Sequence, residues 1–243
     1  MSKAFSNVYD DQERAEAYDT LEYPATYYLA FRDLPALFAQ YVSGKAALDF
    51  GCGTGRSTRF LRDLGFDVVG VDIAEEMLVR ARARDPHGAY RLVPDGDLRG
   101  LVPDRYDLIL CAFTFDNVPT SQKKTVLFEA LAGLLTDGGR IVCVVSDPAI
   151  YVNEWASFST RDFPENRSAK SGDRVRIVML DVADRRPVED ILCDGADYEG
   201  IHARAGLRAM AVHRPLGDES EPYPWVSETA LSPWVVYVLA RDV

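Results

Sequence analysis

The sequence predicts an α/β fold with a doubly wound, seven-stranded and mostly parallel sheet that is Rossmann-like in its winding. Three observations predict it. Strand-like and helix-like segments alternate from residue 46 onward, the central strand-like segments are apolar throughout, and a glycine-rich loop follows the first of them. Central parallel strands are covered by helices on both faces, so they read as continuous apolar runs. Crossovers between parallel strands are right-handed, which restricts the possible windings.

The core of this sheet begins with a strand over residues 46–50 and a helix over 56–64. The alternation continues with strands over 67–72, 90–93, 106–113 and 140–145 and with helices over 75–84 and 122–135. Short apolar runs bounded by turn residues favour strands, whereas apolar residues at intervals of three and four favour helices. We therefore expect successive βαβ units.

The segments outside this core depart from the alternation. Residues 13–18 and 27–41 read as helices, and the aromatic stretch 146–173 has no clear period. Later elements are expected as an antiparallel strand pair at 174–180 and 187–193, a helix at 196–205 and strands at 207–213 and 234–240. The predicted single domain has four parts: an N-terminal helical cap (1–45), a ligand-binding core (46–145), an inserted lid (146–195) and C-terminal strands that complete the sheet (196–243).

Composition restricts the partners of this chain. Its 243 residues carry a formal net charge of −11, whereas binding to phosphates requires clustered lysines and arginines. Nucleic acid and membrane surfaces are therefore not expected as partners, and a neutral or cationic small molecule is. No apolar run reaches the ~18 residues of a membrane span, and residues 1–10 lack the apolar region of a signal peptide. A soluble, cytoplasmic protein is expected, with a homodimer as the default assembly.

The four cysteines predict neither a metal site nor a disulfide framework. None belongs to a C-x-x-C pair, and no histidine lies at a zinc-ligand spacing from any of them. Three of the four lie in or beside apolar strand-like runs, where cysteine behaves as a small buried hydrophobic residue. We expect reduced thiols and no bound metal.

The glycine-rich loop between the first strand and the first helix is the strongest functional signal. It begins after Asp49, carries Gly51, Gly53 and Gly55, and ends at Arg56. Glycines here let a ligand approach the backbone, and the start of the helix supplies exposed N–H groups. A dinucleotide fingerprint, G-x-G-x-x-G, requires a third glycine where Arg56 stands. A pyrophosphate site is therefore not expected.

Two carboxylates flank this loop in a way that selects its ligand. Asp49 precedes the loop, where it repels a phosphate and attracts a cation. Asp72 ends the second strand, where its carboxylate is placed to accept hydrogen bonds from both hydroxyls of a ribose. An adenosine with a positively charged amino-acid tail and no phosphate needs both features. Asp49 could instead cap the following turn, and Asp72 could cap the helix that begins near Glu75.

The motifs between residues 9 and 145 resemble those of the class I S-adenosylmethionine-dependent methyltransferases, in particular the branch that acts on small molecules. Residues 49–55 match that family's first motif, an acidic residue followed by G-x-G-x-G, and Asp72 matches its ribose-binding acid. Residues 96–98 (GDL) are similar to its adenine-edge segment, and residues 134–140 (LLTDGGR) to the LL-x-x-GG turn before the fifth strand. The resemblance implies S-adenosylmethionine as cofactor and S-adenosylhomocysteine as product.

The resemblance also implies individual cofactor contacts. The Asp97 carboxylate would accept from the adenine amine, although it could instead be a solvated residue of this acidic loop. Tyr18 is similar to tyrosines that close over the cofactor in related enzymes, and it could instead pack a helix. Further residues expected at the cofactor are Ile73, Leu98 and Phe113.

The acceptor pocket is expected beyond the fourth strand, because strand ends line the ligand site of such sheets. Asp116 is the catalytic candidate there, although it or Asn117 could instead cap the helix beginning near Thr120. His202 is the second candidate, although a lone histidine is more often a surface or core residue. Tyr9 and Phe115 are expected to line this pocket as well. The insert adds Tyr151, Trp155, Phe158 and Phe163, which line the pocket or pack the insert on the core.

The implied chemistry is an in-line methyl displacement, for which positioning matters most. Acidic and aromatic walls stabilise a sulfonium, and a closing lid excludes water. No Lys–Asp–His constellation marks an oxygen acceptor, so nitrogen and oxygen both stay open. Two other functions compete. A nicotinamide-dependent oxidoreductase is disfavoured by the missing third glycine and by the lack of a Tyr-x-x-x-Lys pair. A non-catalytic module that binds the same cofactor would keep every motif.

Overall fold

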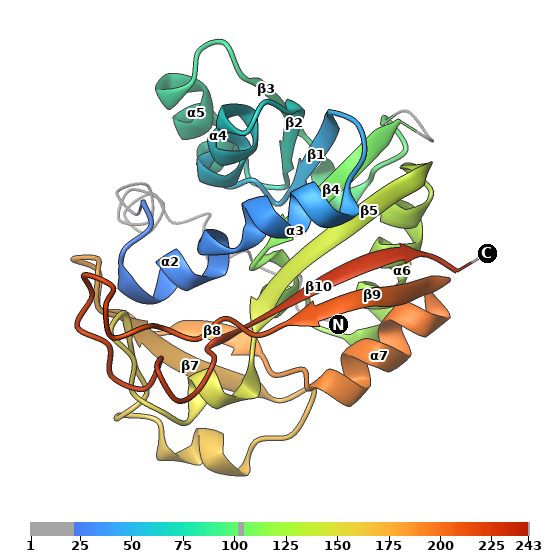
Figure 1. Cartoon of the computed structure of the whole chain (residues 1–243). Coiled ribbons are helices and arrows are strands. Elements are labelled where there is room, and N and C mark those ends of the chain that lie inside the picture. The colour runs from blue at the N-terminus through green and yellow to red at the C-terminus, as the bar shows by residue number, and fades with distance from the viewer. Residues whose placement is uncertain (1–21, 102–104, 243) are drawn as a thin grey trace.

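The structure is a computed structural model that describes residues 22–101 and 105–242. Seven strands of these residues form one sheet in the order β3-β2-β1-β4-β5-β10-β9 (Figure 1). Strands β1 to β5 pair in parallel, whereas β10 is antiparallel to both β5 and β9. The predicted Rossmann-like, mostly parallel sheet is confirmed.

The elements of the described residues follow one another as Figure 1 shows. The large sheet consists of β1 (Ala46–Phe50), β2 (Asp67–Asp72), β3 (Ala89–Leu92), β4 (Tyr106–Ala112), β5 (Leu135–Ser146), β9 (Leu207–His213) and β10 (Trp234–Arg241). The α-helices are α2 (Ala25–Arg32), α3 (Leu34–Tyr41), α4 (Arg56–Asp63), α5 (Glu75–Arg84), α6 (Ser121–Ala132) and α7 (Gly195–Arg204). Short 3-10 helices are η2 (Pro94–Gly96), η3 (Thr114–Asn117), η4 (Pro148–Tyr151) and η5 (Pro164–Ser168).

Two elements differ from the sequence prediction. The helix expected over 27–41 is divided into α2 and α3 at Asp33, and Pro35 lies in the first turn of α3. Proline lacks the N–H that would continue the preceding helix, so it is tolerated only at a new start. Strand β5 begins at Leu135 because the predicted turn itself pairs with β4, Leu135 with Tyr106, before the register shifts.

Alternate residues of the central strands face two separate hydrophobic layers. In β1, Leu48 packs in the layer that contains α6 and α7, whereas Ala47 packs in the layer that contains α2 and α3. In β4, Ile109 and Leu108 divide in the same way. All four side chains are fully buried, and burial of each Leu or Ile contributes about 1.5–3 kcal/mol. The central strands are therefore apolar on both faces, as predicted.

The insert after β5 carries a second, antiparallel sheet. Its strands are β6 (Phe158–Ser159), β7 (Arg174–Met179) and β8 (Val188–Ile191), in the order β6-β7-β8. The expected antiparallel pair is confirmed by β7 and β8. This sheet packs against the large one through the layer that also holds α2.

A buried carboxylate joins α2, the insert and the loop before β10. Glu228 is fully buried, and its Oε1 accepts from Thr26 Oγ1 at 2.6 Å and from the backbone N of Ala156 at 2.8 Å. Its Oε2 accepts from the backbone N of Val226 at 2.8 Å and of Ser227 at 3.1 Å. A charge-assisted hydrogen bond is about twice as strong as a neutral one. Glu228 therefore connects three segments that are distant in sequence.

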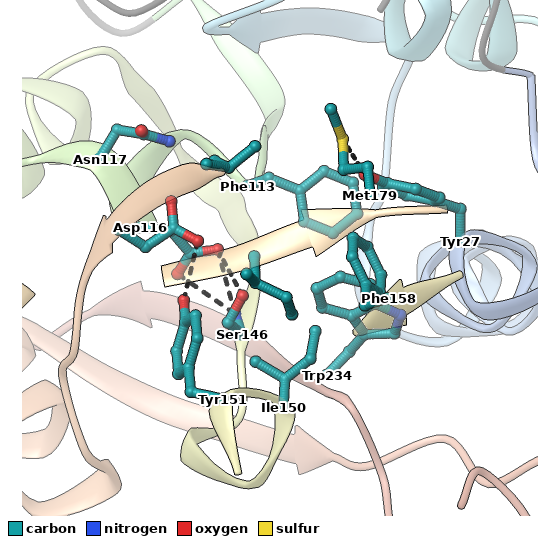
Figure 2. A pocket seen from close by; sticks show the side chains of 13 residues that line it. Tyr27, Phe113, Asp116, Asn117, Ser146, Ile150, Tyr151, Phe158, Met179 and Trp234 are labelled. Carbon is teal, nitrogen blue, oxygen red and sulfur yellow. Dashed lines mark hydrogen bonds between the residues drawn. The ribbon is translucent and has the colours of Figure 1, made fainter. Parts of the chain in front are cut away.

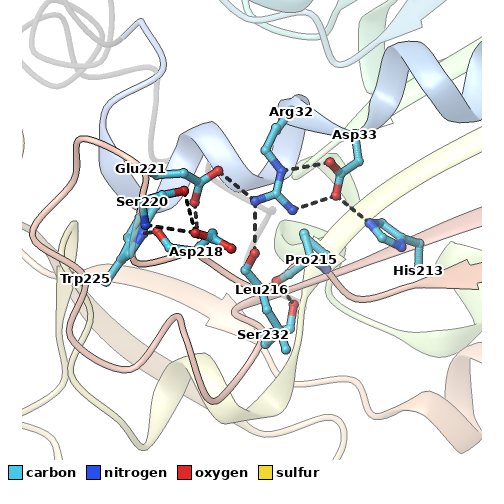
Figure 3. Close-up of polar contacts among 10 residues, drawn as sticks. All are labelled: Arg32, Asp33, His213, Pro215, Leu216, Asp218, Ser220, Glu221, Trp225 and Ser232. Carbon is cyan, nitrogen blue, oxygen red and sulfur yellow. Dashed lines mark hydrogen bonds and ion pairs between the residues drawn. The ribbon is translucent and has the colours of Figure 1, made fainter.

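A second polar cluster fastens α2 to the same loop (Figure 3). The guanidinium of Arg32 donates to both carboxylate oxygens of Asp33, to Glu221 Oε1 and to the carbonyl of Leu216. The Nε2 of His213 lies 2.7 Å from Asp33 Oδ2. The end of α2 and the end of β9 are thereby held together.

None of the helices in the described ranges has the length and apolar character needed to span a membrane.

Candidate functional site

The glycine loop lies where the strand order of the sheet reverses. β2 and β3 extend from β1 in one direction, whereas β4 and β5 extend in the other. Ligands of open α/β sheets bind outside the carboxyl ends of the strands at such a point. The backbone N atoms of Gly51 and Cys52 donate to the carbonyl of Val71 at 2.8 and 3.0 Å. These bonds hold the loop over the carboxyl end of β2.

The three glycines of the loop differ in what surrounds them. All have positive φ: 76° at Gly51, 54° at Gly53 and 82° at Gly55. A Cβ at Gly51 would lie 2.3 Å from Thr114 Oγ1, and one at Gly55 would lie 2.6 Å from the hydroxyl of Tyr90. At Gly53 the nearest described atom would be 3.9 Å away. Gly51 and Gly55 therefore permit close packing, whereas Gly53 leaves room for a ligand beside the backbone.

Asp49 is fully buried beneath the loop. Its Oδ2 accepts from Ser57 Oγ at 2.7 Å and from Thr58 Oγ1 at 2.6 Å, so α4 supplies both donors. Its Oδ1 has no hydrogen-bond partner among the described residues. Burial raises the pKa of Asp49 to about 6, although the hydrogen bonds from Thr58 and Ser57 oppose this. An unpaired buried acceptor at this position fits a cationic ligand group.

Asp72 lies at the end of β2, and its carboxylate connects the strand to the glycine loop. Oδ2 accepts from the backbone N of Gly53 at 2.8 Å, and Oδ1 accepts from the backbone N of Ala74 at 2.9 Å. Residue 74, not Asp72, is the N-cap of α5, so the capping alternative for Asp72 is wrong. A carboxylate can accept about four hydrogen bonds, so these two contacts are compatible with ribose binding.

The expected adenine-edge residues lie in different environments. Ile73, next to Asp72, is 40% exposed, whereas Leu98 is buried. Asp97 is at the surface, where the guanidinium and backbone N–H of Arg99 donate to it and lower its pKa to about 2. The carboxylate is thus already engaged by a neighbouring side chain. Tyr18 and Tyr9 lie outside the described residues.

A pocket opens at the ends of β4 and β5, next to the glycine loop (Figure 2). Its interior measures about 50 Å³ within a concavity of about 450 Å³ that opens to solvent. The residues that line it are Tyr27, Phe113, Asp116, Asn117, Ser146, Ile150, Tyr151, Phe158, Ile177, Met179, Val188, Asp190 and Trp234. The large sheet, α2 and the insert all contribute, so the pocket lies between the sheet and the lid.

One wall of this pocket is aromatic. Phe113 follows β4 with a left-handed backbone, φ 63°, which is rare for a bulky side chain. Its ring centroid lies 4.8 Å from that of Trp234 and 5.7 Å from that of Tyr27. Figure 2 shows these three side chains on one side of the pocket. The hydroxyl of Tyr27 donates to Met179 Sδ at 3.3 Å. Planar or cationic groups are favoured against such rings.

The opposite end of the pocket is acidic. Asp116 accepts from the backbone N of Ser146 at 3.2 Å and from its Oγ at 3.0 Å (Figure 2). Asp190 accepts from the hydroxyl of Tyr151 at 3.1 Å. Burial raises the pKa of both carboxyls, and the charge of Asp190 raises that of Asp116 further. Lys124 is buried nearby, and its ammonium donates to the carbonyl of Phe115.

Asp116 and Tyr151 therefore lie in the pocket, as the sequence predicts. Helix α6 is capped by Thr120, whose hydroxyl accepts from the backbone N of Lys123 at 3.1 Å, so Asp116 and Asn117 are not its cap. The capping alternative is wrong.

Three other predicted residues lie elsewhere. Phe115 stacks on Phe128 with ring centroids 4.0 Å apart in the core, and Trp155 is buried beside the pocket, with its indole N–H on the carbonyl of Ile150. His202 of α7 packs against Phe128 of α6, and burial lowers the pKa of His202 to about 4. Within the part of the chain that the structure describes, none of the three is among the residues that line the pocket. They fill the interior because large aromatic groups on inward-facing positions pack there first.

Asp190 is the functional candidate that sequence reasoning missed. It lies on β8, whose burial alternates, with Val188 and Asp190 facing inward and Glu189 outward. An acid at the inward position of an alternating strand is the signal that could have identified it.

The four cysteines are buried and free, as expected. No cluster of three potential metal ligands occurs within residues 22–101 and 105–242.

The fold is similar to that of solved S-adenosylmethionine-dependent methyltransferases. Residues 48–141 match the family described as "Methyltransferase domain". The structure superimposes on an S-adenosylmethionine-dependent methyltransferase from Clostridium acetobutylicum with a TM-score of 0.64, at 14% identity and with 97% of both chains covered.

Curated relatives match the same region. A ubiquinone biosynthesis O-methyltransferase of Bordetella pertussis is 31% identical over 134 residues, which are 54% of this chain and 46% of the relative. A demethylmenaquinone methyltransferase of Tropheryma whipplei strain Twist is 40% identical over 115 residues, 45% of this chain and 46% of the relative. This chain thus spans about half the length of these two relatives.

Proposed function

We propose that this chain transfers the methyl group of S-adenosylmethionine to a small aromatic acceptor. One observation carries the proposal: a glycine loop with a buried acid beneath it lies beside an aromatic, acidic pocket at the next strand end. The names of the two relatives, which refer to ubiquinone and demethylmenaquinone, support a quinone-type acceptor.

Four residues of the glycine loop and β2 would hold the cofactor. Gly53 would let the ligand approach its backbone, and Asp72 would accept from the ribose hydroxyls. Ile73, exposed after the end of β2, would cover an adenine face. The buried charge of Asp49 attracts the cationic amino-acid tail. When bound, the cofactor supplies an electrophilic methyl group on a sulfonium that leaves as a neutral thioether.

The pocket residues would orient the acceptor. The rings of Phe113 and Trp234 offer flat apolar faces on which a planar ring can stack. Phe113 leads out of β4, and the next residue, Thr114, donates to the carbonyl of Phe50 at 2.8 Å, beside the glycine loop. The acceptor wall and the loop are therefore held in one rigid unit. Such alignment supplies most of what a methyl displacement requires.

Methyl transfer is tested directly with S-adenosylmethionine that carries a labelled methyl group. The acceptors are catechol, hydroquinone, aniline and a primary aliphatic amine, and label in the extracted product is counted. We expect label in the phenolic products, and a large loss with Asp72→Ala. Asp67→Ala, at the exposed opposite end of the same strand, is the matched control and should transfer as the wild type does. Cofactor binding without transfer to any acceptor would instead indicate a non-catalytic binding module.

A further inference from the structure

Two carboxylates from different elements line the acidic end of the pocket. Asp116 lies on η3, directly after β4 of the large sheet, whereas Asp190 lies on β8 of the insert. Both side chains are more than nine-tenths buried, with 6% and 8% of their surface exposed, and both line the pocket. Acids of such burial carry charge only where partners stabilise it.

Each carboxylate of this pair accepts hydrogen bonds from its own donors. Ser146 donates through its backbone N to both oxygens of Asp116 and through its hydroxyl to Oδ2 (Figure 2). The hydroxyl of Tyr151 donates to Asp190 Oδ2 at 3.1 Å. Two carboxylates that share a buried site do not both ionise, because their like charges repel in a medium of low dielectric constant.

The charge balance around the pair fits a single shared proton. Titratable groups that interact with the pair from the packed elements are Lys124 of α6, Tyr151 of η4, Tyr198 of α7 and Cys193, and Cys143 of β5 interacts with Lys124. Among these described groups Lys124 is the cation. With one proton on the pair, its remaining charge is balanced by Lys124. The end of the pocket is then electrically neutral, which matches a neutral hydroxyl better than an ammonium ion.

We propose that Asp116 and Asp190 act together as the proton acceptor for a phenolic hydroxyl group bound in this pocket. This inference rests on the proposed methyl transfer and names the acceptor group. The hydroxyl oxygen forms the bond to the methyl carbon, and the sulfur–carbon bond breaks with its electron pair going to sulfur. The hydroxyl proton passes to the carboxylate pair and leaves later to solvent through the mouth of the pocket. Charge and atoms balance: the ether, a neutral thioether and one proton are formed.

The location of Asp190 on the insert gives this pair a further property. Asp116 is attached to the large sheet, whereas Asp190 reaches the pocket only because β8 packs against η3. The proton acceptor is complete only when the insert is docked. A general base contributes typically 10²–10⁴-fold to a rate when its pKa is matched to the reaction.

The first test compares Asp190→Asn with Glu189→Gln. Glu189 is the neighbouring residue of β8, faces outward and pairs with Arg174, so its variant controls for changes to the strand. The measurement is kcat/KM for methylation of catechol as a function of pH. We expect a rate that rises with pH through one apparent pKa in the wild type and in Glu189→Gln. Asp190→Asn should lose at least about 100-fold at pH 7 and lose this pH dependence.

Binding of S-adenosylhomocysteine separates this proposal from the proposed function. Calorimetry should give the same affinity for Asp190→Asn and the wild type, because Asp190 lies outside the glycine loop. Unchanged catechol kinetics in Asp190→Asn, with cofactor binding intact, would overturn the proton-acceptor role. Failure of every variant and the wild type to bind the cofactor would refute the proposed function instead.

A second test requires neither acceptor nor activity. Carbon-13 label at Cγ of aspartate lets the two carboxyls be followed by NMR through a pH titration, with Asp116→Asn and Asp190→Asn used for assignment. We expect one carboxyl of the pair to titrate well above the usual range for aspartate. In Asp190→Asn, Asp116 should titrate at lower pH, since the neighbouring charge that raises its pKa is gone. Two independent titrations in the usual range would contradict the pair.

Discussion

The glycine loop and the acceptor pocket lie at neighbouring strand ends, yet they are built in different ways. The loop is one short stretch, residues 49–56, held by backbone bonds to the adjacent β2. The pocket combines side chains from α2, the segment that follows β4, β5, the insert and β10, between Tyr27 and Trp234. Local sequence therefore determines the cofactor side, whereas tertiary packing of distant segments determines the acceptor side.

The largest effect is expected when two glycines of the same loop are substituted separately. Gly51→Ala adds a Cβ that would lie 2.3 Å from Thr114 Oγ1 at a φ of 76°. Overpacking and left-handed strain together should cost about 2–5 kcal/mol of the free energy of unfolding. Gly53→Ala meets no such contact and should cost about 1–2 kcal/mol, from strain alone. Urea unfolding of both variants measures this, and equal losses would refute the division between packing and ligand-facing glycines.

The second largest effect concerns His202, which we now place in the core. Its pKa is lowered to about 4 in the folded protein, so the unfolded chain binds a proton there at higher pH than the folded one. The stability contributed by neutral His202 is therefore present above pH 6.5 and is lost as the pH falls toward 4. A shift from 6.5 corresponds to roughly 3 kcal/mol.

Unfolding of the wild type and His202→Leu at a series of pH values measures this effect. The variant should lack that part of the acid sensitivity, while methyl transfer at pH 7 stays within about twofold, since His202 does not line the pocket. A 100-fold loss of kcat with unchanged stability would return His202 to the catalytic residues.

Asp72 tests the cofactor side alone. Loss of charge-assisted hydrogen bonds in Asp72→Ala should cost about 1.5–3 kcal/mol, or roughly a 10- to 150-fold rise in the Kd for S-adenosylhomocysteine. Asp72→Asn keeps one acceptor oxygen and should fall between this variant and the wild type. Calorimetry with Asp67→Ala as control gives the comparison. An unchanged Kd in Asp72→Ala would refute the ribose assignment.

The smallest expected effect is at Asp97. Its carboxylate is at the surface and already accepts hydrogen bonds from the guanidinium of Arg99. Asp97→Asn should therefore raise the Kd for S-adenosylhomocysteine less than about fivefold, which the same calorimetry measures. A loss as large as that of Asp72→Ala would show that Asp97 binds the adenine directly, despite its ion pair.

The outcome of sequence reasoning follows the same division between the two regions. The sheet and the loop were predicted because apolar runs and glycine spacing are local properties, and β2, α5 and β9 have the expected bounds. Asp116 was expected in the pocket because it follows a strand end, and it lines the pocket. Asp190 was not expected there because its position depends on how β8 docks, while Phe115 and Trp155 were assigned to the pocket although they are not among its lining residues. Side-chain direction on an irregular segment is set by packing, which sequence periodicity does not contain.

Thermal unfolding in the presence of S-adenosylmethionine, S-adenosylhomocysteine or NAD tests the central claim most directly. A ligand at 100 times its Kd stabilises the folded state by about 2.7 kcal/mol, which should raise Tm by roughly 5–10 °C in a chain of this size. We expect this rise in Tm with both adenosyl compounds and no rise with NAD. A shift with NAD alone would contradict it and would make the glycine loop a dinucleotide site.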